Sequence, residues 1–84
     1  MNPIVKIIID TLVAKFQVSP DGVTADSPFA SLALDSLVLI ELGAILSTRF
    51  GVKINGGELL EEHTIGKIAA LIEAKSVRSD SKVG

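Results

Sequence analysis

The stretch LALDSLVLIEL, residues 32–42, is almost wholly apolar, yet Asp35 and Ser36 stand side by side in its middle. After this pair, apolar residues continue at helical spacing to Phe50, and Gly51 then provides a helix stop signal. The sequence therefore predicts a helix that begins at Asp35 or Ser36 and ends near Phe50. Two small polar residues at the start of so apolar a segment need a physical reason.

Two apolar stripes run along this predicted helix. The stripe that we assign to the core comprises Leu39, Leu42, Ile45, Leu46 and Phe50. The second stripe has the same spacing but is rotated around the helix axis, and it comprises Leu37, Ile40 and Ala44. Because one buried stripe is enough to hold a helix on a core, the second stripe either packs on another neighbour or meets a partner or ligand.

Two more helices are predicted on either side of this one. Asn2 and Pro3 form a helix-start pair, and apolar residues at steps of three and four carry a helix from there to about Val18. Thr64 is placed as the N-cap of a last helix. A short helical turn is expected at residues 58–62, and residues 52–54 are interpreted as an extended connector.

The connection between the first two helices, residues 19–34, is long and contains two of the three prolines. Long irregular loops in small domains are often functional. The predicted fold is all-α: a small antiparallel bundle of three main helices plus one short helix, with a long loop between the first two helices. Residues 1–75 are expected to form a single domain, and residues 76–84 a flexible C-terminal tail.

Composition restricts what such a domain can do. The chain has 84 residues, enough for one core, and its apolar fraction of 48% suits a packed globule. It has no Cys, so no disulfide or thiolate metal site is possible. The net charge of −2 comes without a concentrated basic face, which argues against nucleic-acid binding. No apolar run is long enough to span a membrane and no signal peptide is recognised, so a cytoplasmic protein is expected. It is also expected to be a monomer.

Residues for catalysis are also lacking. His63 is the only histidine, and it stands beside Thr64 at a helix entrance, where a solvated residue is expected more often than a catalytic base. No combination of His and carboxylates has the spacing of a zinc site, and the calcium-loop and phosphate-loop patterns are absent. We therefore predict a protein that is not an enzyme and has neither catalytic residues nor a metal site.

Asp35 and Ser36 can be interpreted in two ways. In the simpler interpretation, Asp35 caps the helix and Ser36 is an ordinary residue of its first turn. Three features favour a site instead: the serine follows a long loop, it stands at a helix N-terminus that would favour a phosphate ester, and the Leu37-Ile40-Ala44 stripe starts beside it.

These features together resemble an acyl carrier protein, the phosphopantetheine-bearing family of fatty acid and polyketide synthesis. The resemblance covers about residues 3–75. It is carried by Leu34-Asp35-Ser36-Leu37 with Glu41-Leu42, then by Phe50-Gly51-Val52 with Ile54, and by Thr64-Ile65-Gly66. Each piece is short, but their order and spacing in one small chain are specific.

The resemblance implies that Ser36 receives 4′-phosphopantetheine from coenzyme A through a phosphopantetheinyl transferase, and that the cofactor brings the thiol that the sequence lacks. Asp35 would cap the helix and help to present Ser36 to the transferase and its magnesium. The face that meets acyl-loading, ketosynthase-type or other acyl-processing enzymes would comprise Leu37, Val38, Ile40, Glu41 and Ala44. Candidates to line an acyl cavity, with core packing as the simpler role for each, are Leu42, Leu46, Leu59 and Leu71.

Two departures from the family pattern bear on the pathway. Ala33 stands where a glycine is common, and the helix that starts at Ser36 carries only Glu41 against Arg49, whereas fatty-acid carriers usually have several acids there. A discrete acyl carrier of a dedicated polyketide or other secondary-metabolite pathway, such as antibiotic biosynthesis, is therefore favoured over general fatty acid synthesis. The alternatives are an aminoacyl, peptidyl or aryl carrier, and a plain helical interaction domain in which Ser36 is only part of a cap.

Gly43 lies inside the same predicted helix, where glycine costs roughly 1 kcal/mol against alanine. We expect it to allow close approach by a neighbouring helix or by a partner.

Overall fold

The fold is helical throughout the part of the chain that the computed structural model describes, which is residues 2–55 and 57–83, with side chains up to residue 76. Its elements are α1 (Pro3–Phe16), a short 3-10 helix (Phe29–Leu32), α2 (Ser36–Phe50) and α3 (Ile65–Val83). Over the described ranges no strand is formed, and residues 52–54 are a connector as expected. The all-α prediction is confirmed.

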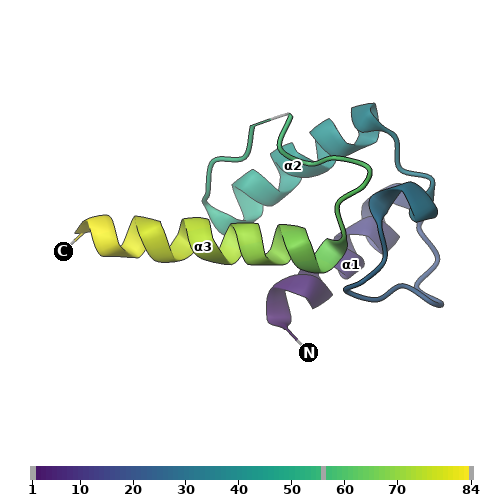
Figure 1. Ribbon diagram of the computed structural model, residues 1–84, viewed down its shortest axis with the longest axis horizontal. Coiled ribbons are helices and arrows are strands. Elements are labelled where there is room, and N and C mark those ends of the chain that lie inside the picture. The colour runs from purple at the N-terminus through teal and green to yellow at the C-terminus, as the bar shows by residue number, and fades with distance from the viewer. Residues whose placement is uncertain (1, 56, 84) are drawn as a thin grey trace.

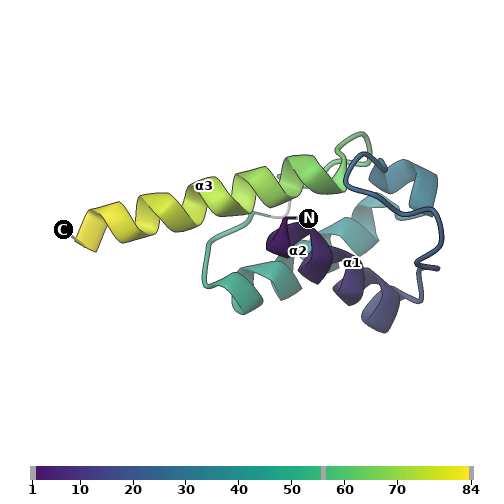
Figure 2. The same ribbon diagram turned by 90° about the horizontal axis from the view of Figure 1, so that it is seen from below.

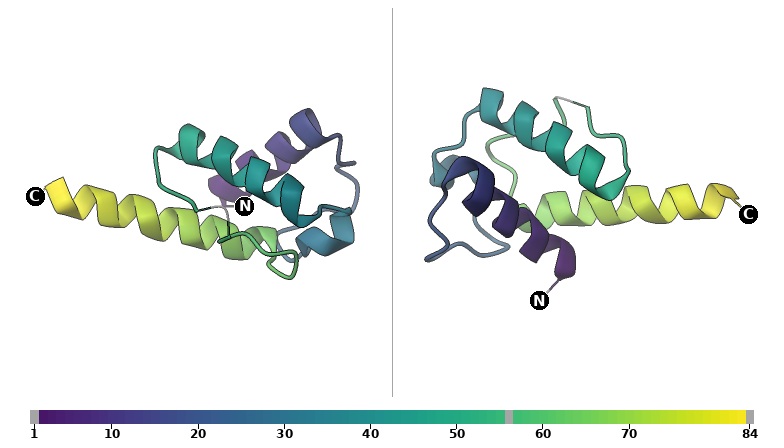
Figure 3. Two further views of the ribbon diagram at one scale, coloured as in Figure 1. Left: turned by 90° about the horizontal axis from the view of Figure 1, so that it is seen from above. Right: turned by 180° about the vertical axis from the view of Figure 1, so that it is seen from behind.

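The three long helices enclose one core (Figure 1). The long loop joins adjacent ends of α1 and α2, so these two helices run in opposite directions, whereas residues 51–64 carry the chain back and α3 runs in the same general direction as α2 (Figures 1 and 3). Fully enclosed side chains come from every helix and from the loop: Ile8, Leu12, Phe29, Leu39, Leu42, Leu46, Ile65, Ile68 and Ile72.

Local signals in the sequence fix the helix ends. The Asn2 side chain accepts a hydrogen bond from the Ile4 N–H at 2.8 Å, which satisfies one of the unpaired donors at the start of α1. At its other end α1 stops at Phe16, slightly before the expected Val18, because Gln17 turns into the left-handed region with φ 59°. Gly51, with φ 65°, ends α2 where the sequence predicted.

Hydrogen bonds join the long loop between α1 and α2 to the connection between α2 and α3, and this positions the start of α2. Phe29 is fully buried, and its N–H donates to the His63 carbonyl at 3.0 Å, while the Ala30 N–H donates to the Glu61 carbonyl at 2.9 Å. On the other side of this contact, the Gly66 N–H donates to the Ala25 carbonyl at 2.8 Å. Because the buried ring and these hydrogen bonds fix the loop, its last residues enter α2 from a defined direction.

The prediction of a short helix at residues 58–62 is wrong. Two carbonyls of this segment do not make α-helical hydrogen bonds: that of Glu61 accepts from Ala30 in the long loop, and that of Leu60 accepts from the His63 N–H at 2.9 Å, which is a turn. The Glu58 carboxylate accepts from the Asn55 N–H at 2.7 Å, which favours a turn. The short helix of the fold is instead the 3-10 helix in the long loop.

Glu58 also links this connection to α3. Its carboxylate pairs with Lys75 at 3.3 Å, and both side chains are about a quarter exposed (28% and 26%). The hydrogen bond from Asn55 is the main reason why the pKa of Glu58 lies below its ordinary value, and Lys75 adds to that effect.

The helix α3 is longer than expected, since its backbone continues to Val83 and Figure 2 shows its last turns extending beyond the rest of the bundle. The expected boundary between a domain of residues 1–75 and a tail therefore falls inside this helix, and the division itself stays a prediction. No Gly or Pro precedes Gly84 in this part of the sequence, so nothing local stops the helix. The flexibility of residues 76–84 stays a prediction. None of the described helices combines the length and the apolar character that crossing a membrane requires.

Candidate functional site

Ser36 is the first residue of α2 and is exposed. Leu34, just before it, is buried (5% exposed), and Leu39, in the next turn, is fully buried. The serine is therefore held between two side chains that the core fixes, and its hydroxyl lies in solvent. The sequence prediction of an accessible serine at a helix start is borne out by this geometry.

Asp35 caps α2, as predicted. Its Oδ1 accepts a hydrogen bond from the Val38 N–H at 3.0 Å, and its carbonyl accepts from the Leu39 N–H at 3.0 Å. The N–H groups of Ser36 and Leu37 belong to the first turn, where an α-helix has no carbonyl to offer them. Two donors and the positive end of the helix dipole thus lie beside the Ser36 hydroxyl, where they suit a phosphate ester.

Ala33 gives the chain its sharp entry into α2. It has φ 60°, in the left-handed region that glycine adopts without strain and other residues adopt at a cost of about 1–2 kcal/mol. The Ala33 N–H donates to the Ala30 carbonyl at 3.2 Å, and the Leu34 N–H donates to the Phe29 carbonyl at 3.3 Å. The departure noted in the sequence, an alanine where a glycine is common, therefore falls at a position whose backbone favours glycine.

The second apolar stripe of α2 is exposed. Leu37 is 73% exposed and Ile40 is 49% exposed, and Ala44 and Glu41 also lie at the surface. Two large aliphatic side chains in water, one turn apart and next to Ser36, make a surface that could bind a partner.

Comparison with known proteins identifies the family of this chain. The family model described as "Phosphopantetheine attachment site" matches residues 6–72. The chain belongs to this family of carrier domains. The cofactor of this carrier domain is accordingly 4′-phosphopantetheine.

Among curated proteins, the carrier domain is similar to part of a lovastatin diketide synthase of Aspergillus terreus, with 36% identity over 61 residues. It is also similar to part of a triacetic acid lactone synthase of Aspergillus versicolor, with 37% identity over 62 residues. These matches cover 73% and 74% of this chain but only 2% and 3% of the two relatives. No solved structure matches the chain significantly.

The described residues fit the phosphopantetheine group. A phosphodiester at Ser36 needs an accessible hydroxyl and donors for the phosphate oxygens, and both are present at the start of α2. Within the described part of the chain, no three His, Asp or Glu side chains gather closely enough to hold a metal ion. The His63 ring accepts from the Leu60 N–H at 3.1 Å through Nδ1, so it holds the connection in place.

Val38 differs from the other residues of the predicted partner face. It is half-buried, and it lines a hollow on the loop side of α2 instead of the exposed stripe. At the far end of the stripe, Ala44 lines a shallow hollow between α1 and α2 together with Lys15 and Arg49. The exposed surface of α2 therefore has Glu41 near its middle and Arg49 at one end, where Lys15 of α1 lies close by.

The residues offered as acyl-cavity candidates pack in the core. Leu42 and Leu46 are fully buried and Leu59 is 3% exposed, while Leu71 is half-buried against the same cluster. Their observed surroundings are those of core packing, which was the simpler role.

Gly43 does not have the role that we expected. It is buried, and a Cβ built on it would lie 3.5 Å from the Ile54 Cγ2 and 3.9 Å from the Leu59 Cδ1, which are ordinary contacts with the connection. The position therefore faces neither a neighbouring helix nor a partner, and it has room for a methyl group.

Sequence reasoning missed the hollow beside Val38, and it missed the two strained residues that line it, Gln17 and Ala33. Leu60 was also missed as an exposed apolar residue (45%), because it was assigned to a helix that does not form. A signal existed only for Ala33, which stands directly before Leu34 where the family often has glycine.

Proposed function

We propose that this domain carries acyl intermediates as thioesters on a 4′-phosphopantetheine arm attached to Ser36, and presents them to partner enzymes. The observation that carries the proposal is the exposed Ser36 hydroxyl on a capped helix N-terminus, within a chain of the phosphopantetheine-attachment family. Attachment at Ser36 also explains how a protein without cysteine holds a thioester, because the thiol belongs to the arm.

Loading forms a phosphodiester. The Ser36 oxygen attacks the phosphorus that joins pantetheine to the nucleotide half of coenzyme A, a P–O bond of the diphosphate breaks, and adenosine 3′,5′-bisphosphate leaves while the hydroxyl gives up its proton. The carrier supplies position: Asp35 fixes the first turn through Val38, and the N–H groups of Ser36 and Leu37 are free to face the new phosphate. The catalytic groups belong to the phosphopantetheinyl transferase.

Partner enzymes are proposed to dock on the α2 surface formed by Leu37, Val38, Ile40, Glu41 and Ala44. The exposure of Leu37 and Ile40 supports this role. Val38 is half-buried, so only part of its side chain is available at the border of this surface. Within Ser36–Phe50 the single acid, Glu41, is balanced by the single base, Arg49. Burial of the apolar side chains should therefore supply most of the affinity, at roughly 25 cal/mol per Å² before the costs of association.

A dedicated polyketide or other secondary-metabolite pathway fits this near-neutral surface better than general fatty acid synthesis. Both named relatives are synthases, and one is a diketide synthase by name, which supports a polyketide-type cargo. That the carrier acts as a discrete protein stays a prediction.

The experiment that tests the proposal is intact-mass measurement after incubation with coenzyme A and a promiscuous phosphopantetheinyl transferase. We expect the mass to rise by one phosphopantetheine group. Ser36→Ala should remain folded and gain no mass, whereas Ser31→Ala, at another exposed serine near the start of α2, should load like the original chain. Loading that persists in Ser36→Ala would overturn the assignment, and a helical interaction domain would show no loading at all.

A further inference from the structure

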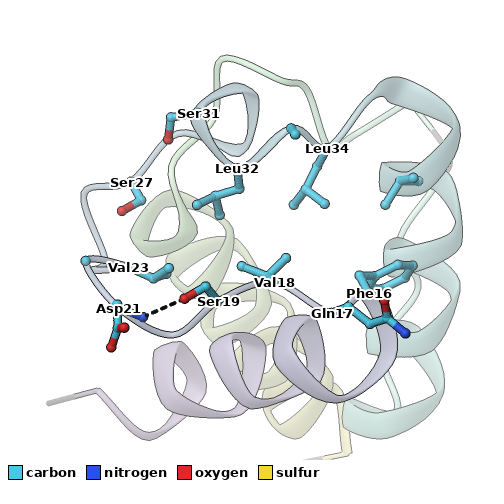
Figure 4. A pocket seen from close by; sticks show the side chains of 13 residues that line it. Phe16, Gln17, Val18, Ser19, Asp21, Val23, Ser27, Ser31, Leu32 and Leu34 are labelled. Atoms are coloured by element: carbon cyan, nitrogen blue, oxygen red, sulfur yellow. Dashed lines mark hydrogen bonds between the residues drawn. The ribbon is translucent and has the colours of Figure 1, made fainter.

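The hollow beside Val38 lies between the C-terminal end of α1, the long loop and the start of α2 (Figure 4). Its volume is about 670 Å³, within the range of roughly 300–1,000 Å³ that is typical of small-molecule sites. Figure 4 shows Leu32 and Leu34 pointing into it from one side and Val18 from the other.

Ser36 is a near neighbour in the chain of residues that line this hollow. Leu34 and Val38, which lie on either side of Ser36 in the sequence, both line its wall. Leu34 is buried and Val38 is half-buried, while Ser36 itself is exposed. A long, flexible group attached to the Ser36 oxygen therefore starts within two residues of the lining, and it can fold either into the hollow or along the exposed stripe of α2.

The lining combines apolar and polar groups. Its floor is formed by half-buried aliphatic side chains, including Val18, Val23 and Leu32. Its rim carries serine hydroxyls: the Ser19 Oγ accepts from the Asp21 N–H at 3.4 Å, and the Ser27 Oγ accepts from the Thr24 N–H at 2.9 Å. Each hydroxyl keeps its own O–H for donation to a further acceptor. A pantetheine chain has the matching composition, since its dimethyl and methylene groups alternate with two amides.

The shape of the hollow is fixed by strained backbone. Gln17 (φ 59°) and Ala33 (φ 60°) both line it, and they are the non-glycine residues with positive φ in the described part of the chain. Such residues persist only where the surrounding structure holds them, and they concentrate at functional sites. A surface that is already shaped before its ligand arrives loses less entropy on binding.

From these observations we infer that the phosphopantetheine arm, once attached to Ser36, folds back into this hollow and packs its dimethyl group against Val18, Val23 and Leu32. The inference rests on the proposed function, because it needs the arm on Ser36. The hollow and the exposed α2 stripe then have separate roles: the first holds the arm, and the second binds the enzyme that withdraws it.

The test compares the apo and phosphopantetheine-loaded protein by NMR, with loading checked first by intact mass. We expect nuclear Overhauser effects between the dimethyl protons of the arm and the methyl groups of Val18, Val23 and Leu32. We also expect amide shifts to change at residues 17–23 as well as next to Ser36. If no mass is gained, the proposed function fails; if mass is gained but the contacts are absent, only this inference fails.

A filled hollow provides the matching variant. Val23→Phe should load normally and lose the contacts between the arm and Leu32, while Ala44→Phe, on the exposed stripe, should keep them. If Val23→Phe does not fold, Leu32→Phe fills the same hollow. In that variant the contacts between the arm and Val18 are measured, and they should be lost. Contacts from the arm to Leu37 or Ile40 in the unmodified loaded protein, in place of the hollow, would overturn the inference.

Discussion

Both faces of α2 carry an apolar stripe in the sequence, but the two stripes have opposite surroundings. On one face, Leu39, Leu42 and Leu46 are fully buried. On the other, at the same helical spacing, Leu37 is 73% exposed and Ile40 is 49% exposed. The buried face holds the helix on the core, so its hydrophobic free energy is already used in folding. The exposed face begins at Ser36, and its apolar area remains available for association.

This difference underlies the proposal that one apolar stripe of α2 serves folding and the other serves docking. Substitutions on the buried face should therefore lower the free energy of unfolding, whereas substitutions on the exposed face should weaken binding to partner enzymes. The expected change in the free energy of unfolding is largest on the buried face, smaller at two glycines that contact other segments, and smallest at Ala33, directly before α2.

The largest loss of stability is expected for Leu42→Ala, on the buried face. Truncating a fully buried leucine typically lowers the free energy of unfolding by about 2–5 kcal/mol, through lost burial and the cavity that remains. Ile40→Ala, on the exposed face, should lower it by less than about 1 kcal/mol. Denaturant unfolding of the pair measures both values, and equal losses would show that the exposed stripe also supports the fold.

Two glycines should respond in opposite ways to an added methyl group. At Gly66, a Cβ would lie 3.1 Å from the Ala25 carbonyl oxygen, which is backbone and accepts the Gly66 N–H, so Gly66→Ala should lower the free energy of unfolding by about 1–2 kcal/mol. At Gly43 the methyl group has room, and Gly43→Ala should raise it by up to about 1 kcal/mol without changing loading. Thermal unfolding of the two variants checks the signs. A destabilised Gly43→Ala would mean that the connection packs more tightly on α2 than its contact distances indicate.

The smallest effect is expected at Ala33, where the chain enters α2. Ala33→Gly relieves left-handed strain of about 1–2 kcal/mol but gives the unfolded chain more freedom, worth about 0.4–1 kcal/mol. The net gain in the free energy of unfolding should be about 1 kcal/mol or less. Denaturant unfolding measures it, with Ala30→Gly in the 3-10 helix as a control that should lose stability. A loss in Ala33→Gly would contradict the strain that we assign to this residue.

Much of this fold could be predicted from local signals. Asn2 and Asp35 act as N-caps, Thr64 does so through a 3.1 Å hydrogen bond from the Lys67 N–H, and Gly51 ends α2. These predictions succeeded because a cap depends on neighbouring residues alone. Ser36, the serine that we propose for attachment, could be placed at the start of α2 for the same reason.

The missed features depend on residues that are distant in the sequence. The segment 58–62 has helix-forming residues, but the Glu61 carbonyl accepts from Ala30 in the long loop instead of from a residue of its own helix. The hollow beside Val38 likewise needs α1, the loop and α2 together, so no single stretch of sequence predicts it. Periodicity showed that α2 has two apolar stripes, but only the assembled fold shows which one is covered.

The division of α2 into a folding face and a docking face is tested most directly with Ile40→Asp. The measurement is the affinity of the loaded carrier for its cognate acyl-processing enzyme at low and at physiological salt, beside the free energy of unfolding. We predict that the variant remains folded and binds at least about tenfold more weakly, equivalent to about 1.4 kcal/mol. Ala70→Asp, at an exposed position of α3, should bind like the original chain. The affinity of the original chain should fall only slightly as the salt concentration rises. Normal binding by Ile40→Asp, together with a steep loss of wild-type affinity with salt, would contradict the account and assign recognition to exposed charges instead.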